Sequence, residues 1–194
     1  MTSAAGMTFV DDEEFCRVRS AIVELHKEEL KFSAGHFMLL SATQRESMHG
    51  HDYQIQVAFH TLIGQNGMTF DCRLYKQRIL NICQFLDYRF ILPGQSDLMR
   101  VYEEGDQWIA QFGQQRIPFF KEDAVVLPIC NVTLEELSHW FLQQIVSDQD
   151  ELQEHRIQGV TVKVFNGRGE SGSTSWGEIL GFSAVINRDM IREI

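Results

Sequence analysis

The feature that most constrains the fold is an alternation of apolar and polar side chains over residues 51–62. Tyr53, Ile55, Val57 and Phe59 fall on one face of an extended chain, because successive side chains of a β-strand point to opposite faces. The turn sequence GQNG at residues 64–67 ends the run. Residues 29–37, which come before it, also suit a strand. We therefore expect two consecutive strands that pair antiparallel.

The rest of the chain adds two helices and two strands. Residues 71–85 have a helical period of apolar side chains. Asn131 or Thr133 can cap a second helix, since acidic residues follow in its first turn. Two more strands are predicted over residues 159–165 and from residue 173. This order predicts an α+β fold in which a four-stranded antiparallel sheet carries two helices on one face.

The domain organisation predicted from this pattern is simple. Residues 1–20 form an N-terminal extension, and residues 21–194 form a single domain with no internal repeat. Two strand-like runs near residues 98–129, on either side of an acidic turn, predict a hairpin insertion between the two helices.

Composition excludes several classes of protein. The net charge of -10 argues against nucleic-acid binding and against an anionic membrane surface, both of which need Lys and Arg. We find no apolar run near the roughly 20 residues that span a bilayer, and no signal peptide at residues 1–10. A cytoplasmic protein is therefore expected. None of the four cysteines forms a CxxC pair, so we expect reduced thiols at Cys16, Cys72, Cys83 and Cys130.

A possible metal site lies at the start of the alternating strand. His49 and His51 are two residues apart, so on a strand both imidazoles point to the same side. Gly50 between them allows another chain segment to approach closely. His36 lies on the preceding strand and can face the same ion if the two strands pair. Three imidazoles leave a fourth tetrahedral position open, as in catalytic zinc sites. The pattern alone also allows polar surface histidines. A cupin-type site is disfavoured because residues 52–56, directly after His51, contain no Glu.

These motifs resemble those of the 6-pyruvoyl-tetrahydropterin synthase family, which includes 6-carboxytetrahydropterin synthase. The matching segments are FSAGH at 32–36, HGHDY at 49–53, GMTFD at 67–71, LDY at 86–88 and NVTLE at 131–135. The resemblance implies a tunnelling fold, in which the sheets of neighbouring subunits close into a barrel. It also implies a homohexamer built as a dimer of trimers, pterin pockets between subunits, and Zn²⁺ held by His36, His49 and His51.

The catalytic residues implied by the resemblance depart from the usual family pattern. Many members carry a cysteine shortly before HGH, whereas residues 42–48 contain no Cys but include Glu46. The chain thus resembles a variant group in which Glu replaces that cysteine; a solvated loop acid is the alternative. Asp87 matches the family's Asp-His pair, but Tyr88 stands where the His is usual. A phenol has a pKa near 10, so it is a poor base and a suitable acid at neutral pH.

Two further residues are candidates for substrate binding. Glu170 is the nearest match to the family's pterin anchor, since a carboxylate accepts two parallel N–H bonds from the pterin edge. Thr133 resembles a pocket residue, although a plain helix cap is the alternative.

The function implied is that of a zinc-dependent lyase acting on 7,8-dihydroneopterin or its triphosphate. Cleavage of the side chain to 6-hydroxymethyl-dihydropterin is the leading reaction, with Glu46, Asp87 and Tyr88 as catalytic residues. The alternatives are a 6-carboxytetrahydropterin synthase-type activity and a non-catalytic homologue that binds zinc and pterin.

Overall fold

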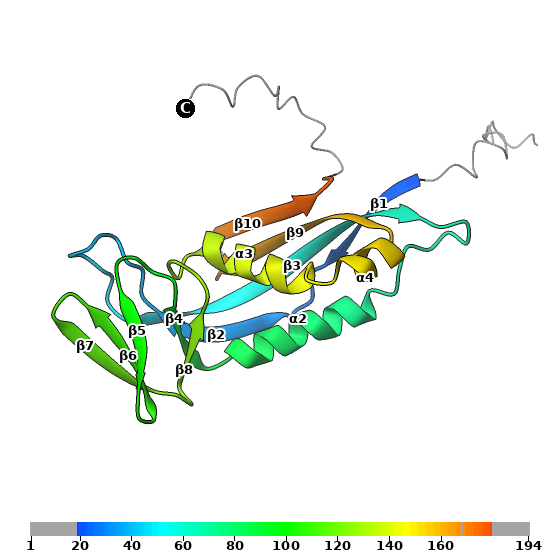
Figure 1. Cartoon of the computed structure of the whole chain (residues 1–194). Coiled ribbons are helices and arrows are strands. Elements are labelled where there is room, and N and C mark those ends of the chain that lie inside the picture. Colours follow the sequence, from blue (N-terminus) through cyan, green and yellow to red (C-terminus); the bar gives the residue numbers. More distant parts are fainter. Residues whose placement is uncertain (1–18, 168, 180–194) are drawn as a thin grey trace, which may run out of the picture.

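The computed structural model describes residues 19–167 and 169–179. Its main element is a curled sheet, with helices lying along one face and a smaller sheet at one end (Figure 1). The seven strands of the main sheet are β1 (Arg19–Leu25), β2 (Lys31–His36), β3 (His49–Ile63), β4 (Arg89–Pro93), β8 (Ala124–Leu127), β9 (Ile157–Asn166) and β10 (Glu170–Gly177). The helices are α2 (Arg73–Leu86), α3 (Leu134–Ile145) and α4 (Gln149–Glu154).

Strand β3 organises this sheet, because three other strands pair with it. On one side β2 pairs with its first half and β1 with its second half, both antiparallel. On the other side β9 pairs antiparallel along most of its length. Between β1 and β2 the chain stays attached to the same strand, since the carbonyl of Leu30 accepts the N–H of Ile55 at 2.8 Å. The long alternating segment thus fixes the register of its neighbours.

The predicted α+β class is confirmed, whereas the prediction of four antiparallel strands is wrong. The sheet has seven strands in the order β10-β9-β3-β2-β4-β8, with β1 added beside β3. It is also mixed, because β4 pairs parallel with both β2 and β8. Strands β4 and β8 are five and four residues long, too short for a clear period in the sequence.

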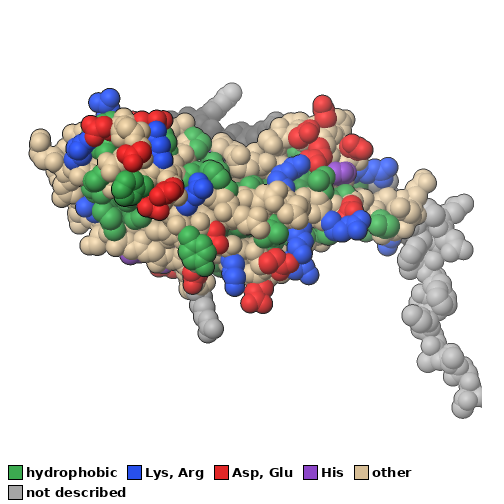
Figure 2. All heavy atoms as spheres, turned by 90° about the horizontal axis from the view of Figure 1, so that it is seen from below, with side chains coloured by type: hydrophobic (Ala, Val, Ile, Leu, Met, Phe, Trp, Pro, Cys, Tyr) green, Lys and Arg blue, Asp and Glu red, His purple; other side chains and the backbone are tan. Residues whose placement is uncertain are grey.

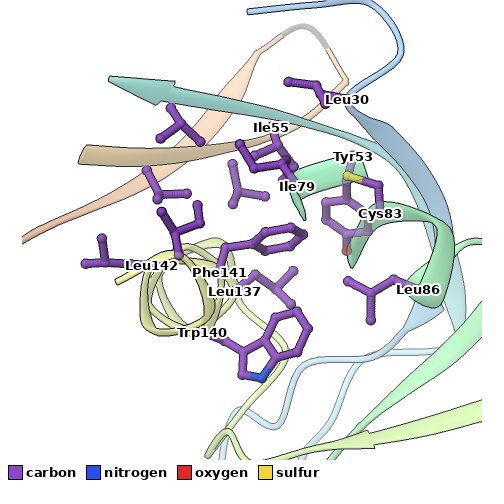
Figure 3. Packing of buried hydrophobic residues seen from close by; sticks show 14 of the residues in the cluster. Leu30, Tyr53, Ile55, Ile79, Cys83, Leu86, Leu137, Trp140, Phe141 and Leu142 are labelled. Carbon is purple, nitrogen blue, oxygen red and sulfur yellow. The ribbon is translucent and has the colours of Figure 1, made fainter. Parts of the chain in front are cut away.

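The main core lies between the sheet and helices α2 and α3 (Figure 3). Tyr53, Ile55, Val57 and Phe59 are at most 2% exposed, which confirms the alternation of β3. The fully buried side chains that the helices contribute are Tyr75, Ile79, Leu86, Leu137, Phe141 and Ile145. Burial also raises the pKa of the Cys83 thiol to about 12, so this cysteine is protonated and inert at neutral pH.

The start of α3 connects the helix layer to the loop that follows β2. Thr133 is the N-cap, and its side chain accepts the N–H of Glu136 at 3.3 Å. Asn131, the other candidate cap, instead pairs with the backbone of Leu39: its Oδ1 accepts the N–H at 3.0 Å and its Nδ2 donates to the carbonyl at 2.9 Å. The entry to α3 and the segment after β2 are therefore held side by side.

Residues 98–129 contain three strands of a separate sheet, after which the chain returns to the main sheet as β8. We call β5 (Arg100–Glu104), β6 (Gln107–Phe112) and β7 (Gln115–Phe120) the accessory sheet. A second apolar cluster joins the accessory sheet to the main sheet, and it includes Phe37, Leu92, Met99 and Phe112. Charged and hydrophobic side chains are intermixed over this end of the molecule (Figure 2, left).

Two expectations remain, one about the N-terminal extension and one about membrane-spanning segments. β1 begins at Arg19, and residues 1–18, which hold most of the predicted extension and Cys16, lie outside the described residues. Among the helices of the described part, none has the length and apolar character needed to cross a membrane.

Candidate metal centre

The three histidines predicted as metal ligands meet at the paired ends of β2 and β3. His36 lies directly opposite His49 in the antiparallel register, and His51 follows two residues later on the same face. One ligand nitrogen from each ring can be chosen so that all three lie within 4.8 Å of one another. Gly50 permits the close pairing of β2 and β3 here, because a Cβ on it would lie 3.1 Å from the carbonyl oxygen of Ala34.

Backbone carbonyls orient two of the three rings. The Nδ1 of His36 lies 3.1 Å from the carbonyl of Val132, and the Nδ1 of His49 lies 2.8 Å from that of Ser47. A carbonyl only accepts, so the neutral tautomer that fits these contacts has its proton on Nδ1 and presents Nε2 to an ion. Such second-sphere bonds are the usual way that proteins fix the tautomer of a metal-binding histidine.

The environment of His36 fits a bound cation. Its side chain is 5% exposed, and its Nε2 is buried without a hydrogen-bond partner among the described residues. Burial lowers the pKa of His36 to about 4, so the ring is neutral at pH 7. A buried nitrogen without a partner costs free energy unless something binds its lone pair. Three neutral imidazoles with an open fourth position are the donor set of catalytic zinc sites.

Glu46 lies beside this triad. One carboxylate oxygen, Oε2, is 3.9 Å from the Nε2 of His49 and accepts the backbone N–H of Met38 at 3.1 Å. The backbone N–H of Glu46 donates to the carbonyl of Met38 at 2.9 Å. Two hydrogen bonds thus anchor Glu46 at the edge of the site, where the side chain remains 29% exposed. A carboxylate in this position can accept a proton from a molecule bound at the triad.

Asp87 and Tyr88 follow the C-terminal end of α2. Oδ1 of Asp87 accepts the backbone N–H of Ser33 at 2.8 Å. Tyr88 is 86% exposed and has a positive φ of 58°. Neither has a hydrogen bond or ring contact with the triad within the described part of one chain. Tyr88 and His51 do both line an open groove of about 600 Å³.

The two predicted substrate-binding residues lie on neighbouring elements, since Gly172 of β10 packs against the backbone of Leu134 at the start of α3. Thr133 caps α3, directly after the residue whose carbonyl orients His36. Glu170 begins β10, where it is exposed and its Oε2 accepts the side-chain N–H of Asn166 at 2.9 Å. A role of either residue toward a pterin stays a prediction.

Sequence reasoning missed the backbone groups that complete the site. The carbonyl of Val132 and the amide of Met38 hold His36 and Glu46, respectively. Backbone groups are identical at every residue apart from proline, so no letter in the sequence marks them. The side chain of Asn131, which pairs with the backbone of Leu39, lies nearby.

The chain is similar in sequence to a family of known proteins. The sequence profile of the family described as 6-pyruvoyl tetrahydropterin synthase matches residues 24–175. A Methanocaldococcus jannaschii protein provisionally named 6-carboxy-5,6,7,8-tetrahydropterin synthase is 27% identical over 143 residues, which are 73% of this chain and 86% of the relative. A Pyrococcus horikoshii protein with the same provisional name is 27% identical over 119 residues, 61% of this chain and 71% of the relative.

Solved structures show the same fold. The 6-pyruvoyl tetrahydropterin synthase of Plasmodium vivax superposes with a TM-score of 0.77 at 24% identity, over 82% of this chain and 99% of that one. The Plasmodium falciparum protein of that name gives a TM-score of 0.77 at 23% identity, with the same coverage. The match of the family profile over residues 24–175 shows that this chain belongs to the 6-pyruvoyl tetrahydropterin synthase family.

Proposed function

We propose that this protein is a zinc-dependent lyase that cleaves the side chain of 7,8-dihydroneopterin, or of its triphosphate. The products from dihydroneopterin would be 6-hydroxymethyl-dihydropterin and glycolaldehyde. The observation that carries the proposal is the position of Glu46, whose Oε2 lies 3.9 Å from the Nε2 of His49. Two Plasmodium vivax structures are described as catalytic residue mutants in which a glutamate is replaced by alanine or cysteine. A glutamate is therefore named as catalytic in that protein, which supports the same role for Glu46.

The chemistry divides between the cation and the side chains. When bound by His36, His49 and His51, Zn²⁺ supplies a Lewis acid for the oxygens of the substrate side chain. Glu46 accepts the proton of the hydroxyl on the second side-chain carbon. The bond between the first and second carbons then breaks, so that glycolaldehyde leaves and the electron pair stays on the ring-attached carbon. An acid protonates that carbon, and the phenol of Tyr88 is suited to this at pH 7.

The proposal requires more than one subunit. Asp87 and Tyr88 make no contact with the triad among the described residues of one chain, so we propose that a neighbouring subunit brings them to the pocket. A homohexamer of the tunnelling-fold type would do this and would also cover the open strand edges of the sheet. We place the pterin ring against Glu170 and Thr133, and the protein in the cytoplasm. Light scattering should report a hexamer, and a stable monomer at micromolar concentration would contradict this arrangement.

Two other functions have specific support. The curated relatives are provisionally named 6-carboxy-5,6,7,8-tetrahydropterin synthases, which favours that type of activity as the second candidate. Tyr88 in place of the usual His favours a non-catalytic homologue that binds zinc and pterin.

A direct assay separates these candidates. The purified zinc-loaded protein is incubated with 7,8-dihydroneopterin or its triphosphate, and pterin products and glycolaldehyde are measured. We expect glycolaldehyde from dihydroneopterin and little pyruvoyl product from the triphosphate. Formation of a carboxytetrahydropterin would favour the second candidate. Pterin binding without turnover would favour the non-catalytic one.

Variants of Glu46 test the assigned base. Glu46→Ala should lower kcat by about 10²-fold or more, the usual scale for the loss of an acid-base group. Its zinc content should stay unchanged, because the carboxylate is outside the ligand group. Glu122→Ala, which removes an exposed carboxylate from the turn after β7, serves as the matched control. Full activity of Glu46→Ala would refute the assignment.

A further inference from the structure

The segment that carries Glu46 is held from two sides. Residues 37–48 connect β2 to β3, and on the inner side Met38 binds both the backbone and the carboxylate of Glu46. On the outer side lies Arg45, whose guanidinium is 5.0 Å from the centroid of the Phe37 ring. Phe37 is 1% exposed and belongs to the apolar cluster that joins the accessory sheet to the main sheet.

Arg45 connects Glu46 directly to the accessory sheet. Its Nη1 donates to the carbonyl of Glu46 at 2.7 Å. Its Nε and Nη2 donate to a single acceptor, the Oε1 of Gln115, at 3.1 Å and 3.0 Å. One planar guanidinium thus bridges the backbone of the proposed base and the first residue of β7. The planar fork of an arginine permits this two-sided geometry, which a lysine ammonium does not reproduce.

At the far end of this bridge the side chain of Gln115 is exposed, but its backbone is held by strand pairing. Gln115 begins β7, which pairs with β6 along its whole length. Phe119 on β7 stacks on Phe90 of β4 at a centroid distance of 4.6 Å. Gln115 is therefore attached, through β7, to the strand that pairs with β2. The accessory sheet and the histidine-bearing strands form one connected frame, with the loop of Glu46 between them.

We propose that Arg45 and Gln115 are positioning residues and that the accessory sheet serves to hold Glu46 at its working distance from the histidine triad. The inference rests on the proposed role of Glu46 as a base. The distance matters because a displacement of about 1 Å at a reacting group can cost on the order of 10²-fold in rate. The loop has mostly exposed side chains between Leu40 and Gln44, so the Arg45 contacts supply restraint that burial there does not.

The test uses two variants of Gln115 and one control in the full-length, zinc-loaded protein. Gln115→Ala removes the shared acceptor of Arg45. Gln115→Glu keeps an oxygen acceptor for both N–H groups and should rescue the function. Gln111→Ala makes the same truncation at an exposed position of β6 and is the matched control.

The test has two readouts, amide hydrogen exchange and kcat, and the first does not depend on activity. The amide of Met38 donates to the carboxylate of Glu46, and the amide of Glu46 donates to the carbonyl of Met38. Hydrogen exchange of these two amides reports how often the loop opens. In Gln115→Ala we expect these amides to exchange about 10-fold faster, the scale of one lost hydrogen bond to a charged group. We also expect kcat on dihydroneopterin to fall by about 10-fold with KM and zinc content unchanged. Gln115→Glu and Gln111→Ala should match the wild-type protein in both readouts.

The outcomes separate this inference from the proposed function. Unchanged amide exchange in Gln115→Ala would overturn the inference, and so would faster exchange with an unchanged kcat. Loss of kcat in Gln115→Ala without rescue by Gln115→Glu would also overturn it. Absence of turnover by the wild-type protein would instead refute the proposed function, and the exchange rates would still show whether Gln115 restrains the loop.

Discussion

Removing the metal should make the stability of this protein depend on pH through His36. In the folded chain its pKa is lowered to about 4, chiefly by burial, whereas an unfolded chain has a histidine pKa of about 6.5. Between these values the unfolded state binds more protons, so the free energy of unfolding decreases as the pH falls. The stability is fully present above pH 6.5 and is lost progressively down to about pH 4.

The size of this effect follows from the two pKa values. The linkage relation gives a loss of about 2 kcal/mol between pH 7 and pH 5 for this one group. His36→Leu removes the titrating ring, so the metal-free variant should lack that part of the pH dependence. At pH 7 the variant loses the bond to the carbonyl of Val132 and also the unpartnered Nε2. These changes oppose each other, and we expect a net difference within about 1 kcal/mol.

The assay is urea unfolding of chelator-treated wild type and His36→Leu at pH 7 and pH 5. His60 also has a pKa lowered by burial, but it is present in both proteins and cancels in the double difference. A double difference below about 0.5 kcal/mol would refute the claim that burial keeps His36 neutral. Saturating zinc should raise the stability of the wild type by RT ln(1 + [Zn]/Kd) and leave the variant nearly unchanged.

Three further predictions follow from the same structure. His49→Ala or His51→Ala should reduce the zinc content, measured by elemental analysis, to a small fraction of one ion per chain. His139→Ala, which changes an exposed residue of α3, should retain the zinc. Full zinc occupancy in either His49→Ala or His51→Ala would refute the assignment of the triad as the metal site. Tyr88→Gly should raise the free energy of unfolding by about 1 kcal/mol, because a non-glycine residue at a φ of 58° is strained. An unchanged or lower thermal midpoint of the variant would contradict this. Thr133→Val should lower the free energy of unfolding by about 1 kcal/mol, because it removes the N-cap bond to Glu136. Thr133→Ser keeps the hydroxyl and is the conservative control. Equal stability of the two variants would show that the cap bond contributes nothing.

The parts of the fold that the sequence predicts are those with a regular period and a buried face. The alternation around Tyr53 and Ile55 predicts β3, and the helical spacing of Ile79 and Cys83 predicts α2. In contrast, β1 has mostly exposed and half-buried side chains, so its residues show no strong pattern. The parallel strands β4 and β8 depend on partners far along the chain, and no local signal announces such a pairing.

The candidate site was predictable to a similar degree. The spacing of His49 and His51 fixes a common face on any strand, and the antiparallel register then brings His36 opposite His49. The distance of Glu46 from His49 was not accessible, because it depends on a loop held by Met38 and Arg45. The left-handed conformation of Tyr88 was equally hidden, since tyrosine has no preference for it.

The closeness of the three candidate metal ligands along the chain has a consequence for biosynthesis. His36, His49 and His51 lie on two consecutive paired strands, so their meeting requires only a local hairpin of low contact order. The carbonyl that orients His36 belongs to a residue 96 positions later. At translation rates of about 5 to 20 residues per second, that residue is made roughly 5 to 20 s after His36. A nascent chain therefore holds all three candidate ligands before α3 is made, and the carbonyl of Val132, just before that helix, orients the ring of His36 only later.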